Sequence, residues 1–160
     1  MVVMTALMGA IGSAMMLAGR AVPDRATPLG AVAEAQQAVA LLVTDLMTAQ
    51  TLATCKPEEI DFSVADRDGD SNAETIRYDW SQTAGAPLTR EYNASAVSQV
   101  AEQAYEFRLQ CETKTVDSKR YVTSVRIRLR TSTDPLTQVE TRVRLLNEPE
   151  APVGMEVEPW

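Results

Sequence analysis

The first nineteen residues restrict the fold of this chain more than any other segment. Met1 to Gly19 contains no charged residue, and its only polar side chains are Thr5 and Ser13. As a helix, this segment has a length of about 28 Å, close to the roughly 30 Å hydrocarbon core of a bilayer. The remaining residues suffice for one domain with its own core, which would leave such a helix uncovered. The sequence therefore predicts a transmembrane or assembly helix at 1–19 that carries a water-exposed head.

Small side chains recur along this predicted helix in two neighbouring rows, one of which has an alanine at every fourth residue. Such rows allow another helix backbone to approach closely, which is how helices associate in lipid. The alternative is a plain membrane anchor that is rich in Ala and Gly. The predicted helix-association face consists of Thr5, Ala6, Gly9, Ala10, Ser13 and Ala14.

A cleaved secretory signal is a second interpretation of the same segment. Gly19-Arg20-Ala21 fits a small-x-small cleavage site, but the basic residues that precede the apolar run of a signal peptide are missing. Both interpretations place the rest of the chain outside the cytoplasm. We expect a single-pass protein of the inner membrane with a periplasmic or extracellular head.

Composition narrows the classes of function. The chain of 160 residues has a formal net charge of −7 and no histidine. The negative charge argues against nucleic-acid binding, because phosphate contacts need a basic surface. Without histidine, the chain lacks the commonest general base and the usual ligands of catalytic zinc. The sequence predicts a protein that is not an enzyme and that binds neither nucleic acid nor a small-molecule substrate.

The periodicity of apolar residues predicts one long helix followed by strands. Over 31–53 they recur at three- and four-residue steps, with Asp45 among the polar residues off the apolar stripe. From Ile60 onward they alternate with polar residues, which is typical of an antiparallel sheet with one face in water. We expect a hairpin of strands 60–64 and 76–80, an edge strand at 88–92, and strands at 105–111, 121–130 and 139–145. We expect residues 93–104 to form a loop with a helical turn.

These elements predict an α+β fold in which an apolar N-terminal helix precedes an amphipathic helix packed on one antiparallel sheet. The expected parts are a transmembrane or assembly helix at 1–19, a Pro-containing linker at 20–30, a head at 31–146 and a disordered acidic tail at 147–160.

The acidic turn after the first strand is the sharpest local motif. Asp66, Asp68, Asp70 and Glu74 take loop positions one, three, five and nine, where alternate side chains face inward. Carboxylates in that number suit Ca²⁺ at a weak affinity of about 10⁻⁴–10⁻³ M. The loop lacks the Gly at position six and the Glu at position twelve of an EF-hand. The alternative is a solvated turn, since Asp, Gly and Asn are ordinary turn residues.

Two cysteines, Cys55 and Cys111, have neither CxxC spacing nor a histidine partner. In an exported protein such a pair can close. They either form a disulfide that joins the helix to the sheet or remain two separate buried thiols.

Five arginines share the outward face of the last two predicted strands. Like charges that lie opposite one another are unfavourable, so acids must offset some of them. They either face an acidic partner surface or form a solvated face. These residues are Arg126, Arg128, Arg130, Arg142 and Arg144.

The organisation of the chain resembles that of type IV pilin-like proteins, especially the minor pseudopilins of type II secretion systems. MVVMTALMGAIGSAMML is similar to the body of their N-terminal segment, and VADRDGDSNAETIRYDWSQTAGAPLTREYN and VETRVRLLNEPE are similar to their head regions. The resemblance implies a pilin-like fold and a filament subunit whose N-terminal helix passes from the membrane into a bundle with other pilin-like subunits. It also implies that calcium can stabilise the head.

The start of the sequence departs from that family. A basic leader, a Gly-Phe-Thr-Leu-x-Glu-type processing motif and the Glu of the mature end are absent, so peptidase processing is assigned to no residue here. We expect the natural chain to begin upstream of Met1. A basic leader there would hold the cytoplasmic side, where Arg20 and Arg25 alone would reverse the orientation. The alternative function is a secreted or membrane-anchored calcium-binding α+β module with a cleaved signal.

Overall fold

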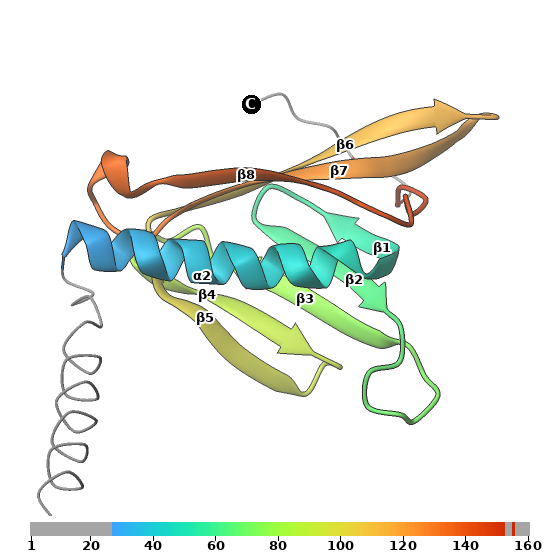
Figure 1. Cartoon of the computed structure of the whole chain (residues 1–160), viewed down its shortest axis with the longest axis horizontal. Helices are drawn as coiled ribbons and strands as arrows, with labels where there is room; N and C mark the ends of the chain where they lie inside the picture. Colours follow the sequence, from blue (N-terminus) through green and yellow to red (C-terminus); the bar gives the residue numbers. More distant parts are fainter. Residues whose placement is uncertain (1–26, 153–154, 156–160) are drawn as a thin grey trace, which may run out of the picture.

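The computed structural model describes residues 27–152 and Met155, and in these residues one helix packs against two antiparallel sheets (Figure 1). The α+β class is as the sequence predicts, but the strands divide into two sheets instead of one. The elements in chain order are α2 (Pro28–Met47), β1 (Ala49–Cys55), β2 (Glu59–Val64), β3 (Glu74–Trp80), β4 (Ala86–Tyr92), β5 (Ala96–Ala104), β6 (Glu106–Val116), β7 (Lys119–Arg130), the 3₁₀ helix η1 (Pro135–Thr137) and β8 (Val139–Arg144).

Helix α2 begins within the segment that was expected to be a linker. The Thr27 hydroxyl oxygen accepts a hydrogen bond from Gly30 N at 3.1 Å and caps the helix. Pro28 opens the first turn, where its missing N–H leaves no intrahelical bond unmade. The predicted apolar stripe is confirmed, since its residues up to the last turn are buried: Ala35, Ala38, Val39, Leu42 and Leu46.

The C-terminal boundary of the predicted helix is wrong. The helix ends at Met47, and the residues after Thr48 form β1 instead of two further helical turns. β1 pairs antiparallel with β2, where Leu52 lies opposite Phe62. Alanines at helical spacing are compatible with a helix or with a strand. The pairing with β2 therefore decides that this segment is a strand.

The larger sheet contains β1 to β5 in chain order. The predicted hairpin of β2 and β3 is confirmed, with Phe62 opposite Ile76. Two other predictions are wrong. β4 lies between β3 and β5 and is not an edge strand, and residues 93–104 contain strand β5 instead of a loop with a helical turn. The first four residues of β5 are all exposed, so no alternation marks them as a strand.

The smaller sheet has the order β6-β7-β8, and the strands predicted for it are confirmed. Part of the segment expected to be a disordered tail continues along β7. Val122 N donates to Pro149 O at 2.8 Å, and Ala151 N donates to Arg120 O at 2.7 Å. The prediction of disorder is therefore wrong for residues 149–151, because backbone hydrogen bonds order a segment without needing a periodic sequence.

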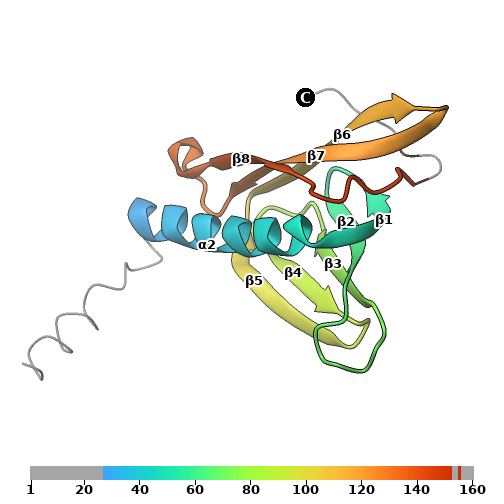
Figure 2. The same ribbon diagram turned by 45° about the vertical axis from the view of Figure 1, so that its right-hand side comes forward.

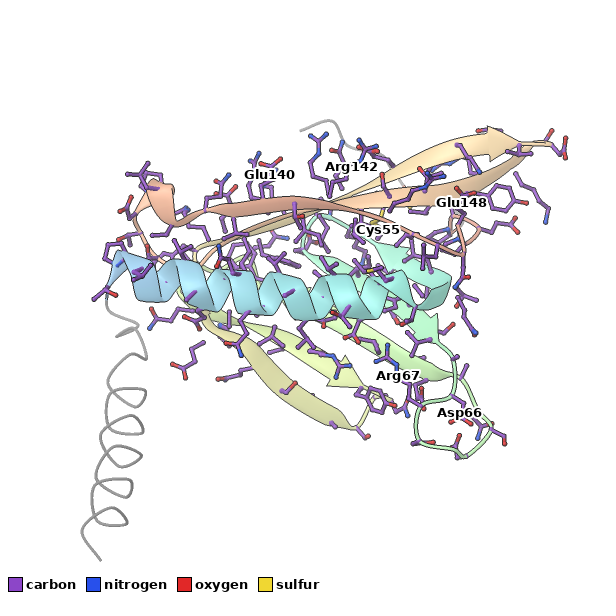
Figure 3. The ribbon with its side chains drawn as sticks, in the orientation of Figure 1. Cys55, Asp66, Arg67, Glu140, Arg142 and Glu148 are labelled. Carbon is purple, nitrogen blue, oxygen red and sulfur yellow. A yellow bond between two sulfur atoms is a disulfide. The ribbon has the colours of Figure 1, made fainter. Side chains whose placement is uncertain are left out.

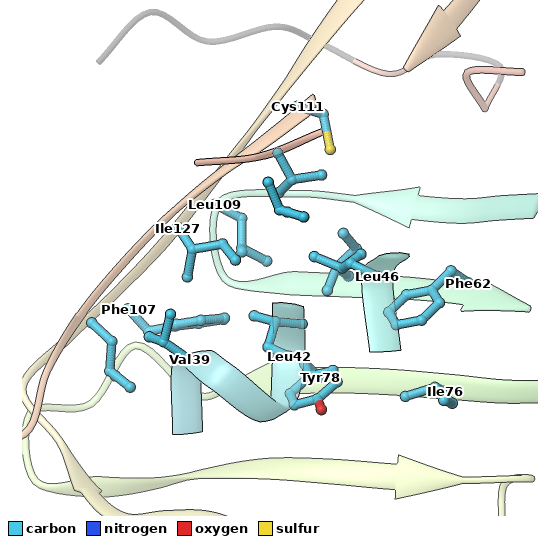
Figure 4. Close-up of a cluster of buried hydrophobic side chains, with 14 of the residues drawn as sticks. Val39, Leu42, Leu46, Phe62, Ile76, Tyr78, Phe107, Leu109, Cys111 and Ile127 are labelled. Carbon is cyan, nitrogen blue, oxygen red and sulfur yellow. The ribbon is translucent and has the colours of Figure 1, made fainter. Parts of the chain in front are cut away.

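Helix α2 lies in the angle between the two sheets, as both views of the ribbon show (Figures 1 and 2). Its apolar stripe meets the inner faces of both, so that Leu42, Tyr78 and Phe107 belong to one buried cluster (Figure 4). A disulfide joins Cys55 to Cys111. Because Cys55 belongs to β1, the bond links the two sheets, and the expectation that it joins helix to sheet is wrong.

A buried carboxylate closes the C-terminal end of the helix–sheet packing. Asp45 was expected off the apolar stripe, yet only 2% of its surface is exposed. It accepts hydrogen bonds at 2.8 Å from Arg67 Nη1, Arg90 Nε and Tyr78 Oη. Burial by itself raises the pKa of Asp45, but the hydrogen bonds from Arg90, Arg67 and Tyr78 outweigh it, so the pKa lies below its ordinary value. We call these four residues the Asp45 junction.

Replacing both cysteines by alanine tests the link between the sheets. The two residues are 56 positions apart, and the chain-entropy model gives about 4 kcal/mol for a loop of that size. We expect the Cys55→Ala, Cys111→Ala variant to lose about 2–4 kcal/mol of unfolding free energy in urea denaturation without reductant. Reductant should destabilise the wild type and leave the variant unchanged. Equal stability of the two oxidised proteins would contradict this role.

Asp45→Asn keeps the shape of the side chain and removes its charge. The lowered pKa means that the carboxylate stabilises the fold above its unfolded pKa of about 4, and that this contribution is lost as the pH falls through the folded value. We expect the variant to lack this part of the acid dependence of stability. At neutral pH the variant should lose about 2 kcal/mol of unfolding free energy. Breaking a fully buried ion pair usually costs about 3–5 kcal/mol, and the loss is smaller here because Arg67 is partly exposed.

The control for this substitution is Asp79→Asn, which changes a half-exposed carboxylate 3.8 Å from Arg77. Its unfolding free energy should change by less than about 0.5 kcal/mol. Thermal and urea unfolding between acid and neutral pH measure both variants. Equal losses in the two would show that the Asp45 junction contributes no more than a surface ion pair.

Candidate metal site

The acidic turn between β2 and β3 brings three of its four predicted ligands together. Asp66, Asp68 and Glu74 each have a carboxylate oxygen within 4.8 Å of the others. Asp70 is not in this group. Its Oδ1 accepts a hydrogen bond from Asn72 N at 2.8 Å, and hydrogen bonds from Asn72 lower the pKa of Asp70. The loop that carries Asp66 projects away from the sheet (Figure 3).

The loop is held by hydrogen bonds from its backbone to its own carboxylates. Asp66 Oδ1 accepts from Gly69 N at 2.6 Å, and Asp66 Oδ2 accepts from Ser71 N at 2.8 Å. Gly69 has a φ of 87°, a left-handed conformation that glycine adopts without steric cost. The short polar residues of this stretch thus form a tight turn that keeps Asp66 and Asp68 near the start of β3.

Glu74 differs from the other carboxylates because it is buried, with 1% of its surface exposed. Its Oε1 accepts hydrogen bonds from Arg67 N at 2.7 Å and Asp68 N at 3.1 Å. Its Oε2 is buried without a hydrogen-bond partner, which is unfavourable for a carboxylate. The Tyr92 phenol lies nearby, since burial and the Glu74 carboxylate raise its pKa. Its hydroxyl nevertheless does not meet the geometry of a hydrogen bond to Oε2. A cation is a group that would satisfy this oxygen.

Arg67 connects the loop to the Asp45 junction. It is the only basic residue among 65–74. Its guanidinium donates to Asp45 at 2.8 Å and to Thr48 Oγ1 at 2.7 Å, toward the end of α2 (Figure 3). The positive charge of Arg67 therefore pairs with Asp45 of the helix and not with the carboxylates of the loop. The three clustered carboxylates keep an excess of negative charge that a hard divalent cation fits.

Sequence analysis named the four acids of the loop but missed the burial of Glu74 and the part played by Arg67. A signal for Glu74 was present, since it has the same parity in β3 as the inward-facing Ile76 and Tyr78. No pattern pairs Arg67 with Asp45, because the two are 22 residues apart and belong to different elements.

The arginines of the outward sheet face lie beside glutamates of β6, of β8 and of the segment that follows β8. This arrangement is what a solvated face of alternating charges requires, and it favours that interpretation over an acidic partner. The ion pairs are Arg126–Glu112 at 3.7 Å, Arg128–Glu140 at 3.1 Å, Arg130–Glu106 at 3.6 Å, Arg144–Glu148 at 3.6 Å and Arg142–Glu112.

The predicted helix-association face lies outside the described residues. Among the residues that the structure does describe, α2 is long and apolar enough to cross a membrane. Core helices of soluble proteins and signal sequences can have the same length and composition, and 44% of the most apolar part of α2 is buried inside the protein. This property alone establishes no membrane location.

A comparison of the chain with protein-family models finds no match, and a comparison with curated proteins finds none either. Function is therefore inferred from the residues and from the geometry that they adopt.

Proposed function

We propose that this protein is a non-enzymatic, pilin-like subunit that assembles through its N-terminal apolar segment into a type II secretion pseudopilus or a type IV pilus. The observation that supports the proposal is the order of the parts. An uncharged segment of membrane-spanning length precedes a helix that packs along antiparallel sheets. This order suits a subunit with a separate assembly element and head.

The physical argument concerns the apolar surface of Met1–Gly19. In the bilayer this surface is covered by lipid, and its small residues let copies pack closely. Outside the bilayer it must be buried against other apolar helices, because exposure costs about 25 cal/mol per Å². A filament core made of such helices meets that need. The head stays outside and contributes further contacts, for which Leu29 is available with 70% of its surface exposed.

A second candidate function is favoured by the unpartnered Oε2 of Glu74. In a secreted or membrane-anchored module with a cleaved signal, the loop would bind Ca²⁺ through Asp66, Asp68 and Glu74. Calcium takes six to eight oxygen ligands, so backbone carbonyls and water would complete the coordination. The two candidates share this site and differ in the fate of the first residues. N-terminal sequencing of the mature protein separates them, since a start near Ala21 or Val22 favours the secreted module.

Removing residues 1–19 tests assembly directly. We expect the truncated chain to be soluble without detergent and to form no filaments in electron microscopy and sedimentation, because the surface that drives assembly is gone. In the full chain, Gly9→Leu should also reduce filament formation, since it fills the close helix contact while the segment stays apolar. Ile11→Phe adds bulk outside the small-residue rows and should have the smaller effect. Polymerisation of the truncated chain would contradict the mechanism.

Calcium binding is tested by thermal unfolding of the full chain in calcium and in chelator. At ten times its dissociation constant, calcium should stabilise the wild type by about 1.4 kcal/mol. Glu74→Gln preserves the size of the side chain and removes the charge, so the calcium-dependent shift should disappear. In chelator this variant should be at least as stable as the wild type, because an uncompensated buried charge is removed.

The matched control for Glu74→Gln is Glu91→Gln, which changes a β4 carboxylate that lies 4.0 Å from Arg77 and is not part of the acid cluster, and which should retain the full calcium shift. Magnesium should stabilise the wild type less than calcium, because it demands a smaller and more regular oxygen shell. Unfolding temperatures that are the same in calcium and in chelator would exclude the site.

A further inference from the structure

The turn between β4 and β5 carries a sequence motif that the proposed function does not use. Residues 93–95 read Asn-Ala-Ser, the acceptor motif for N-linked glycosylation, in which Ser or Thr follows two positions after an Asn with no Pro between them. The chain has two further asparagines, Asn72 and Asn147, and neither has a hydroxyl residue at that spacing. The motif therefore selects Asn93 alone.

The motif lies where a large group can be attached without disturbing the core. Asn93 and Ala94 have φ values of 50° and 53°, and both are exposed, as is Ser95. Asn is among the residues that adopt this left-handed conformation most readily. Because β4 and β5 are the last two strands of the larger sheet, the turn that joins them lies at its outer margin (Figures 1 and 2).

The Asn93 side chain is oriented so that its nitrogen is free. Its Oδ1 accepts a hydrogen bond from Thr75 N at 2.9 Å, and its backbone N donates to Thr75 O at 2.9 Å. Because a backbone N–H can only donate, the oxygen of the carboxamide must face Thr75. Nδ2 then lies on the other side of the carboxamide, and no described residue accepts a hydrogen bond from it. Asn93 therefore presents a positioned, unpaired amide nitrogen at the surface.

Two further observations suit an enzyme that modifies exported proteins. The Ser95 hydroxyl, which the motif requires, is exposed and donates only to Tyr92 O at 3.3 Å. The disulfide between Cys55 and Cys111 fits an oxidising compartment outside the cytoplasm, which is also where N-linked glycans are attached. A folded head in that compartment would expose the whole motif to such an enzyme.

We propose that Asn93 is a site of N-linked glycosylation, and that the donor is an oligosaccharide carried on a polyprenyl diphosphate. In the transfer, Nδ2 forms a bond to the anomeric carbon of the first sugar, and the bond from that carbon to the diphosphate oxygen breaks. The diphosphate leaves with the electron pair of the broken bond, and a base of the transferase takes a proton from Nδ2. The proposal goes beyond assembly and calcium binding, and it rests on the export of the head that both candidate functions include.

The test uses the folded full chain in mild detergent, a purified bacterial-type oligosaccharyltransferase and a polyprenyl-diphosphate oligosaccharide. This enzyme suits the chain because Glu91, two residues before Asn93, supplies the acid that such enzymes also select. We expect the intact mass of the wild type to rise by one glycan. Trypsin cleaves after Arg90 and Arg108, so the glycan should be found on peptide 91–108, in which Asn93 is the only asparagine.

The variants change the hydroxyl and leave Asn93 in place. Ser95→Ala should abolish the transfer, whereas Ser95→Thr keeps a hydroxyl and should be modified like the wild type. Ser98→Ala is the matched control, because Ser98 is also exposed and also donates at 3.3 Å to a backbone carbonyl, and it should be modified in full. No transfer to the folded wild type, or transfer that persists in Ser95→Ala, would overturn the proposal. Neither result bears on filament formation, which the truncation of 1–19 tests separately.

Discussion

The burial of one carboxylate at the end of α2 is the interaction on which the arrangement of the head depends. A negative charge at a helix C-terminus is opposed by the helix dipole, and removal from water adds to the cost. Asp45 is stable there because Arg67, Arg90 and Tyr78 all donate to it. These donors come from the acidic loop, β4 and β3, so neutralising one charge places three segments against the helix.

The two buried acids near the loop are satisfied to different degrees. Asp45 receives two guanidinium groups and a phenol, and its lowered pKa reflects that it is stabilised as an anion. Glu74 receives two backbone N–H groups on Oε1 and none on Oε2. Asp45 therefore has a structural role as an anion, whereas the Oε2 atom of Glu74 is still able to act as a ligand. Arg67 connects the two, because its backbone binds Glu74 and its guanidinium binds Asp45. A cation in the loop would act on the same segment that closes the helix–sheet packing.

The parts of the fold that follow from local pattern could be predicted, and those set by long-range pairing could not. Alternation located β2, β3, β6, β7 and β8, and the apolar stripe of α2 is buried as its spacing indicates. The helix end was missed because the residues after Thr48 suit both structures and their pairing with β2 decides between them. β5 was missed because an exposed outer strand needs no alternation. The acids of the loop were visible in the sequence, but the donors that bury Asp45 come from distant residues without any common motif.

The described residues of the head share one buried core that includes the helix and both sheets, and this bears on how the proposed assembly could occur. The apolar stripe of α2 is covered by the two sheets, and the disulfide joins those sheets to each other. Under the proposed function, the Met1–Gly19 segment would change partners while this cross-linked head stays folded. A subunit that moves from lipid to a filament needs this independence, because the free energy of its transfer then comes from the segment alone.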